Sequence, residues 1–180
     1  MDYAIGIDLG GTKIKFIITD YNGNILDIYS KDTTDKKNPN SWLKCIKNEI
    51  SNIEKKKKKR EKKIKISAKK IGIAAPGMAS KDKSKIISLP GRLSGLENLN
   101  WTKFLNKNFF IPVINDAHAA LYGEYWKGSA KNYNNIIFLT LGTGIGGAFS
   151  INGKLQEGIL GRAGHFGHTC IDPYGKLGIK

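Results

Sequence analysis

Two glycine-rich segments of this chain contain the residue types that bind phosphate groups in tight turns. Each lies between two predicted strands: residues 8–13 in the first segment and residues 142–147 in the second. Backbone N–H groups in a concave turn bind phosphate oxygens, and glycines permit positive φ and close approach of a ligand to the backbone. The candidate phosphate-binding residues are Asp8, Gly10, Gly11, Thr12, Lys13, Thr143 and Gly144. A purely structural hairpin is the alternative for either segment alone.

The side chains of these segments add further chemistry. Thr12 and Thr143 offer hydroxyl donors, and Lys13 offers a positive charge. Asp8 stands at a strand end and is placed to hold Mg²⁺ through water, because that ion prefers oxygen ligands and keeps several of its waters. Gly10, Gly11, Gly144 and Gly146 allow positive φ and close approach of a ligand to the backbone.

The second segment satisfies the GxGxxG pattern but does not predict a dinucleotide-binding fold. That fold needs a helix after the glycines, so that the pyrophosphate meets a helix N-terminus. Residues 148–151, Ala-Phe-Ser-Ile, instead predict a strand. The first segment also leads into a strand and lacks the Gly-Lys-Ser/Thr order of a P-loop. Both glycine segments are therefore predicted to be strand–turn–strand hairpins.

Asn115 and Asp116 stand at the start of a predicted helix. A carboxylate within hydrogen-bond reach of a hydroxyl can accept its proton during phosphoryl transfer. Because the positive end of a helix favours an ionised carboxylate, Asp116 is predicted to remain a base at neutral pH. A simple N-cap role for Asp116 is the alternative.

The order of predicted elements indicates an α/β chain in which the same starting run of three strands occurs twice, the second copy being incomplete. A helix is expected after Asn38 as N-cap and Pro39 as first residue, because Leu43, Ile46, Ile50 and Ile53 recur at helical spacing. A long loop is expected between residue 76 and about residue 100. Strands are expected at 3–7, 13–19, 25–29, 71–75, 111–114, 136–141, 148–151 and 154–156, and further helices at 101–106 and 116–126. The second run of strands predicts a first lobe at 1–130 and the beginning of a second lobe at 131–180.

Composition predicts a globular, cytoplasmic protein. Of 180 residues, 40% are hydrophobic and 25% charged, and the N-terminus lacks the basic and apolar regions of a secretory signal. The net charge of +15 owes +7 to residues 55–63, which carry eight positive charges and one negative charge. This run is expected to be a flexible or helix-extending surface insertion. A nucleic-acid partner is disfavoured because no aromatic residues interleave with the lysines, and no membrane partner is expected.

Four segments in register resemble the ROK family of the actin-like ATPase superfamily. They are residues 8–13, residues 115–116, residues 141–147 and residues 161–168. The resemblance implies an actin-like (ribonuclease H-like) α/β fold, with a complete N-terminal lobe and an incomplete C-terminal lobe. It further implies ATP-dependent phosphorylation of a hexose or N-acetylhexosamine, with ATP, Mg²⁺ and a sugar as ligands.

The resemblance also implies roles for individual residues. Asp116 would be the catalytic base and would bind the sugar together with Asn115, His165 and His168. His165 departs from the family, because most members have a sugar-binding glutamate there, and the charge of a histidine depends on pH near neutrality. Taken without the resemblance, such a histidine pair more often makes local hydrogen bonds. His168 and Cys170 can supply only two of the four ligands of a structural zinc site, so no complete zinc site is expected.

The resemblance stops before the remainder of the second lobe, and kinase activity of the 180 residues is therefore expected to be weak or absent. Some family members are repressors with a DNA-binding module ahead of the first strand; the kinase branch is favoured here because the sequence begins at that strand. A non-catalytic sugar-binding remnant and one half of a split kinase are the alternatives. The sequence is compatible with a homodimer and does not specify one.

Overall fold

We describe the protein from a computed structural model, which covers residues 3–33, 41–60, 68–89, 91, 93–142 and 144–175. The chain forms two compact units, residues 1–119 and residues 120–180, and each is described by itself. The predicted lobe boundary near residue 130 stays a prediction. No helix among these residues is long and apolar enough to cross a membrane.

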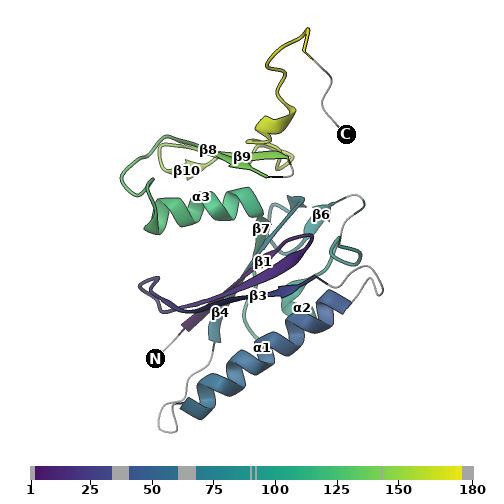
Figure 1. The fold of residues 1–180 in the computed structure, drawn as a ribbon, viewed down its shortest axis with the longest axis vertical. Helices are drawn as coiled ribbons and strands as arrows, with labels where there is room; N and C mark the ends of the chain where they lie inside the picture. Colours follow the sequence, from purple (N-terminus) through teal and green to yellow (C-terminus); the bar gives the residue numbers. More distant parts are fainter. Residues whose placement is uncertain are drawn as a thin grey trace. The chain divides into compact units, whose positions relative to one another are not determined.

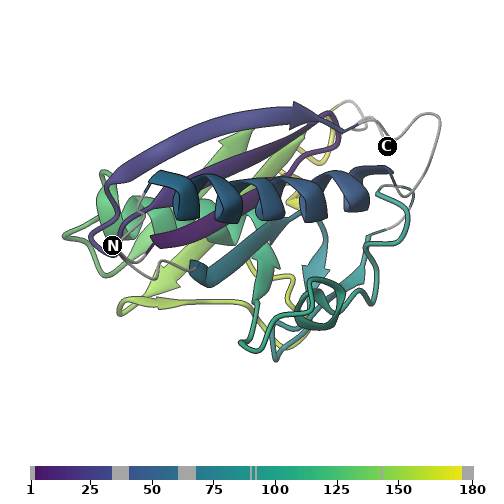
Figure 2. The same ribbon diagram turned by 90° about the horizontal axis from the view of Figure 1, so that it is seen from below.

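The first unit is built on a mixed five-stranded sheet in the order β3-β2-β1-β4-β7 (Figures 1 and 2). Its strands are β1 (Tyr3–Leu9), β2 (Lys13–Thr19), β3 (Ile25–Asp32), β4 (Ala68–Ala75) and β7 (Val113–Asn115). The first three strands form an antiparallel meander, whereas β4 and β7 run parallel to β1. Side chains along β1 alternate between buried and half-buried, so one face of the strand lies in the core.

Helix α1 (Ser41–Arg60) packs against the core face of this sheet (Figure 2). Its buried residues recur at helical spacing and are Trp42, Ile46, Ile50 and Ile53. The Trp42 Nε1–H donates to the Ser94 carbonyl at 3.2 Å, which ties the helix to the connection that follows β6. The helix continues to Arg60, which confirms that the start of the basic run extends it. The predicted cap at Asn38 and Pro39 lies outside the described residues.

The connection between β4 and β7 contains structure where a long loop was predicted. A two-stranded sheet forms from β5 (Met78–Ala79) and β6 (Ile86–Ser88), and α2 (Trp101–Phe104) follows. Asn100 caps α2, accepting a hydrogen bond from the Lys103 N–H at 3.0 Å. The predicted strand at 111–114 was placed too early, because the Ile111 N–H donates to the Thr102 side chain rather than to a neighbouring strand.

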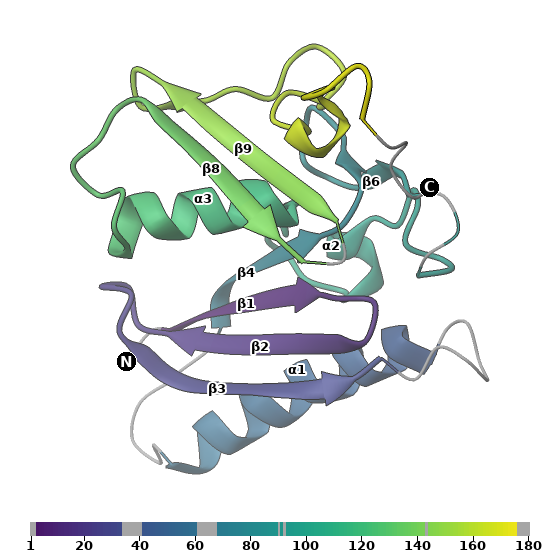
Figure 3. The same cartoon turned by 45° about the horizontal axis from the view of Figure 1, so that its top comes forward.

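The second unit contains an antiparallel sheet in the order β10-β9-β8 (Figure 3). Its elements are β8 (Ile136–Leu141), β9 (Ile145–Ile151), β10 (Lys154–Leu155) and the short 3₁₀ helix η1 (Phe166–His168). Helix α3 (Asp116–Lys127) begins in the first unit and ends in the second. Strand β9 starts three residues before the predicted 148, so Gly147 lies within the strand. A side chain there would collide with Phe166 and with backbone oxygens, and glycine therefore allows residues 164–166 to pack directly on β9.

Candidate functional site

Two carboxylates stand at the carboxyl ends of parallel strands in the first unit. Asp8 lies at the end of β1, on the face opposite α1, and Asp116 directly follows β7. Strand β4 separates the two, with Asp8 beside Ala74 and Ala74 beside Ile114. Neighbouring strands are about 4.8 Å apart, so β1 and β7 are separated by about 10 Å. The sheet order therefore places both acids at one edge, close enough for the charge of Asp8 to act on Asp116.

Asp116 is an exposed residue, but the protein around its carboxylate partly desolvates that group and its pKa is raised. Desolvation by the surrounding protein is the largest cause, and the negative charge of Asp8 raises the pKa further. The Ala117 N–H, which donates to Asp116 Oδ1 at 2.8 Å, and the nearby charge of His118 act in the opposite direction. The sequence analysis was therefore right that the helix N-terminus favours the ionised carboxylate. The net shift of the Asp116 pKa is nevertheless upward, because desolvation exceeds that effect.

The N-cap of α3 is Asn115. Its Oδ1 accepts hydrogen bonds from the N–H groups of Ala117 at 2.9 Å and His118 at 3.3 Å, which are the second and third residues of the helix. Its Nδ2–H donates to the Gly77 carbonyl at 3.1 Å, and the residue is buried. Asp116, the first helical residue, is thus supported by a neighbour that fixes the helix start against the β4–β5 turn.

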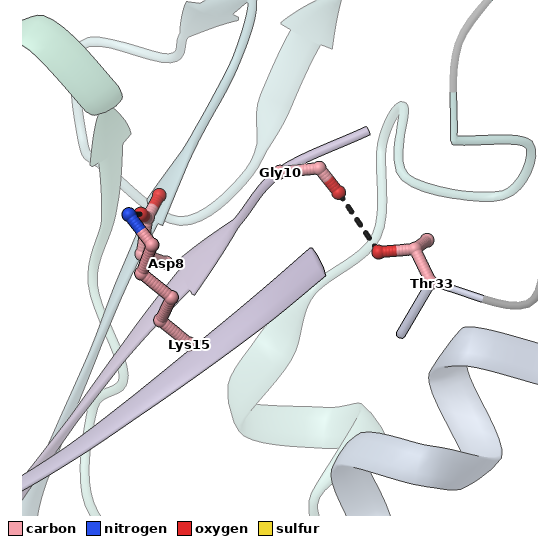
Figure 4. A network of polar contacts seen from close by, with 4 residues as sticks. All are labelled: Asp8, Gly10, Lys15 and Thr33. Carbon is pink, nitrogen blue, oxygen red and sulfur yellow. Dashed lines mark hydrogen bonds and ion pairs between the residues drawn. The ribbon is translucent and has the colours of Figure 1, made fainter. Parts of the chain in front are cut away.

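The loop between β1 and β2 is held closed by hydrogen bonds (Figure 4). The Gly10 N–H donates to the Lys13 carbonyl at 2.9 Å, and the Thr33 hydroxyl donates to the Gly10 carbonyl at 2.9 Å. A β-carbon at Gly10 would lie 2.6 Å from the Lys13 oxygen, whereas one at Gly11 would meet open space. Gly10, Gly11 and Gly146 do not adopt the positive φ that glycine allows. Close packing requires glycine at position 10, and the open side at Gly11 leaves room for a ligand.

Two residues of this loop region were not predicted. Lys15 lies directly opposite Asp8 in the β1–β2 ladder, and its Nζ is 3.6 Å from Asp8 Oδ2. The hairpin register would have revealed that pair, because opposite charges on facing strands attract. Thr33 follows β3, and its N–H also donates to the Thr12 carbonyl at 2.8 Å. No signal in the sequence identifies Thr33, because its role depends on where β3 ends.

The second unit contains the other predicted site residues. Gly142 donates its N–H to the Gly144 carbonyl at 3.0 Å, and a β-carbon at Gly144 would meet open space; Thr143 lies outside the described residues. His165 and His168 flank and end η1, with ring centroids 6.3 Å apart, and the His168 N–H donates to the His165 carbonyl at 3.1 Å. In the part of the chain that the structure covers, no three His, Cys, Asp or Glu residues form a metal-binding group.

The structure therefore brings the predicted residues together in two groups. Asp8, the loop at 10–13, Asn115 and Asp116 lie in the first unit. Gly144, His165 and His168 lie in the second unit. The first group pairs a desolvated carboxylate with a glycine loop and a second acid, which is an arrangement suited to proton abstraction beside bound phosphate.

Several known proteins that resemble this chain in sequence or in structure are sugar kinases. The chain is 32% identical over 184 residues to a glucokinase from Streptomyces coelicolor, covering 98% of this chain and 52% of the relative. It is 31% identical over 176 residues to an N-acetylmannosamine kinase from Escherichia fergusonii, covering 97% and 56%. The structure resembles that of a ROK family glucokinase from Streptomyces griseus, solved with glucose and AMPPNP, with a TM-score of 0.75 and 27% identity, covering 96% of this chain and 52% of that one.

These matches fix the fold and the family. The chain spans about half the length of the relatives that it matches. Its mixed sheet and element order are those of the ROK sugar kinases, which have the actin-like ATPase fold. The sequence pattern of the ROK family matches residues 4–179, so the chain belongs to the ROK family.

Proposed function

We propose that this chain supplies the proton-accepting and phosphate-binding half of an ATP-dependent sugar kinase. The substrate would be a hexose or N-acetylhexosamine, in line with the glucokinase and N-acetylmannosamine kinase relatives. The observation that carries the proposal is Asp116, an exposed carboxylate with a raised pKa at the same sheet edge as Asp8. Because the chain spans about half of those relatives, its activity in isolation is expected to be weak or absent.

Asp116 would act as the general base. The oxygen of a sugar hydroxyl forms a bond to the γ-phosphorus, the bond from that phosphorus to the β–γ bridging oxygen breaks, and ADP leaves. The hydroxyl proton passes to the Asp116 carboxylate. A base works best when its pKa approaches the working pH, so the upward shift caused by desolvation and by Asp8 favours this role. Asn115 would serve by fixing the helix start and by offering to the sugar the amide N–H that it does not donate to Gly77.

The β1–β2 loop would bind the phosphates. Gly11 leaves open space beside the backbone, and Thr12 and Lys13 add a hydroxyl and a positive charge at the same turn. Asp8 presents a half-exposed carboxylate at this edge and fits Mg²⁺, which prefers oxygen ligands and binds through its waters. When bound there, that ion would neutralise charge on the phosphate oxygens. Thr143 and Gly144 would contribute from the second glycine loop.

His165 and His168 would contact sugar hydroxyls. Imidazole nitrogens donate and accept hydrogen bonds, so either histidine suits a hydroxyl group. His165 has the position at which most family members have glutamate, and a histidine there would make sugar affinity depend on pH. A fall in sugar affinity between about pH 7 and pH 5.5 that His165→Gln removes would support this assignment.

The test is ADP release measured over a panel of hexoses and N-acetylhexosamines. Wild-type chain is compared with Asp116→Asn, and Asp27→Asn, an exposed acid on β3, is the matched control. Any sugar-dependent ADP release should fall about 10²-fold or more in Asp116→Asn and stay unchanged in Asp27→Asn. Sugar-dependent release that survives Asp116→Asn would overturn the proposed base.

Binding separates the remaining outcomes. Sugar and AMPPNP should each raise the unfolding temperature of the chain even where turnover is absent. Binding of both without ADP release would favour a non-catalytic remnant or one half of a split kinase. Absence of both binding and turnover would contradict the proposal, and robust turnover by the isolated chain would contradict the expected impairment.

A further inference from the structure

The solvent side of helix α1 consists of positively charged and neutral polar side chains. Side chains are described for residues 41–56 of the helix, and six of these are exposed. All six are lysine or asparagine, and we call them the lysine face: Lys44, Lys47, Asn48, Asn52, Lys55 and Lys56. Lys44 and Lys55 are separated by about three helical turns, so they lie on the same side of α1, about 17 Å apart.

The two acids of α1 do not offset this charge, because lysines from other elements pair with them. Glu49 Oε1 lies 3.7 Å from Lys31 Nζ of β3, and Glu49 Oε2 accepts a hydrogen bond from the Tyr29 hydroxyl at 3.2 Å. Glu54 Oε1 accepts a hydrogen bond from Lys107 Nζ, in the segment after α2, at 2.6 Å. Both acids are half-buried. The lysine face therefore has four positive charges and no negative charge.

This surface fits a partner with closely spaced negative charges. Lysine and asparagine side chains are among those that contact phosphate oxygens in complexes with nucleic acids. A double helix has one negative charge per about 1.7 Å of its axis, so the length between Lys44 and Lys55 corresponds to about ten phosphates. Binding of the four lysines to such a duplex would release counterions from the phosphates, and that release would favour the complex.

The residues of α1 favour a duplex over a single strand or a membrane. Single strands bind largely by stacking their bases on aromatic rings, whereas Trp42, the one aromatic residue of α1, is fully buried. A helix that lies in a membrane interface buries its apolar side in lipid, whereas the apolar side of α1 is buried in the protein core. Contacts with the phosphates of a duplex need neither aromatic nor apolar side chains.

We propose that the lysine face of α1 binds the phosphate backbone of a double-stranded nucleic acid, independently of base sequence. Each of the four lysines would contact a phosphate, and Asn48 and Asn52 would donate hydrogen bonds to phosphate oxygens. The surface is separate from the candidate kinase site, because α1 covers one face of the sheet and Asp8 lies on the opposite face (Figure 2). The inference therefore does not depend on the proposed kinase function.

The experiment measures the fluorescence anisotropy of a labelled DNA duplex of about 20 base pairs, titrated with the full chain between about 50 and 200 mM NaCl. The wild-type chain is compared with a triple variant that combines Lys44→Gln, Lys55→Gln and Lys56→Gln. Each phosphate contact contributes about −0.9 to the slope of log K against log salt concentration, so the slope should become shallower by about 2.7. Affinity at about 0.1 M NaCl should fall about tenfold or more. A second duplex of unrelated sequence should give the same result.

The matched control is a second triple variant that combines Lys81→Gln, Lys131→Gln and Lys154→Gln, three exposed lysines outside α1. Both triple variants lower the net charge of the chain from +15 to +12, so they differ only in where the charge is lost. The control should keep most of the wild-type affinity and salt dependence. Because all six lysines are exposed, both variants should fold, and circular dichroism checks this.

Lack of duplex binding at about 50 mM NaCl would overturn the proposal. Equal losses of affinity in the two triple variants would also overturn it, because net charge alone would then explain the binding. The same titration with single-stranded DNA, and with vesicles of phosphatidylcholine and phosphatidylserine, tests the other two partners. Tighter binding to either than to the duplex would show that the lysine face serves a different partner and would contradict the proposal.

Discussion

Replacement of Asn115 by alanine should destabilise the first unit more than the loss of an ordinary helix cap. Asn115 Oδ1 caps two N–H groups of α3, and its Nδ2–H holds the Gly77 carbonyl. Alanine keeps the backbone and removes both functions at once. The substitution therefore measures how firmly the start of α3, and Asp116 with it, is held against the β4–β5 turn.

The expected magnitude follows from these contacts. Loss of an asparagine N-cap costs about 1 kcal/mol. The Ala117 N–H keeps a second acceptor in Asp116 Oδ1, so the cap term should not exceed that value. Loss of the partly buried bond to Gly77 adds about 1 kcal/mol. A total of about 2 kcal/mol should lower the urea midpoint by about 1 M, for an m-value of about 2 kcal/mol/M.

The assay is urea unfolding followed by tryptophan fluorescence in a Trp126→Phe background. Trp42 and Trp101 are fully buried in the first unit, whereas Trp126 is half exposed in the second, so the remaining signal reports the first unit. Asn100→Ala is the matched control, because Asn100 caps α2 through a single bond to the Lys103 N–H. It should cost only about 1 kcal/mol. An Asn115→Ala effect no larger than that of Asn100→Ala would refute the idea that the amide ties α3 to Gly77.

Three further predictions concern Asp116 and the β1–β2 loop. Asp116→Asn should raise the urea midpoint at pH 7 and leave it unchanged at about pH 3. Because the pKa of Asp116 is raised in the folded state, ionisation of this group costs stability only above its unfolded pKa of about 3.9. Thr33→Val should lower the free energy of unfolding by about 1 kcal/mol by removing the hydroxyl bond to Gly10. Thr19→Val, at a half-buried threonine of β2, is the control, and both variants are read by the same fluorescence assay. Gly10→Ala should shift the loop, because its β-carbon would lie 2.6 Å from the Lys13 carbonyl oxygen. The amide resonances of residues 9–14 should therefore move in an NMR spectrum. Gly11→Ala is the control and should leave most of these resonances in place.

The sequence predicted the parts of this fold that depend on local pattern. The strands β1 and β2, the glycine loop between them and the helical spacing of the α1 core residues all appear in the structure. Asp8 was predicted at the end of a strand and Asp116 at the start of a helix, where the structure has them. These features need only information carried by a few neighbouring residues.

Features that depend on distant segments were missed. Thr33 closes the first glycine loop from the far end of β3, and the Ile111 N–H bonds to the Thr102 side chain and so delays the start of β7. The two strands of the β5–β6 sheet are too short to give a periodic signal. The packing around α3 decides that Asn115 rather than Asp116 caps the helix, and it decides the direction of the Asp116 pKa shift. Neither could be read from the sequence.

The raised pKa of Asp116 has its origin in desolvation first and in sheet topology second, rather than in the residues next to it. Its immediate neighbours favour the ionised form, since the Ala117 N–H donates to it and His118 contributes positive charge. Desolvation and the charge of Asp8 act against them, and Asp8 comes near only because β4 inserts between β1 and β7 and brings both strand ends to one edge. A base held in this way costs folding stability at neutral pH, and the hydrogen bonds of Asn115 to α3 and Gly77 offset that cost at the same position in the fold. Stability and proton affinity at this site are therefore set by adjacent residues with opposite effects, which is why Asn115→Ala and Asp116→Asn should shift the urea midpoint in opposite directions.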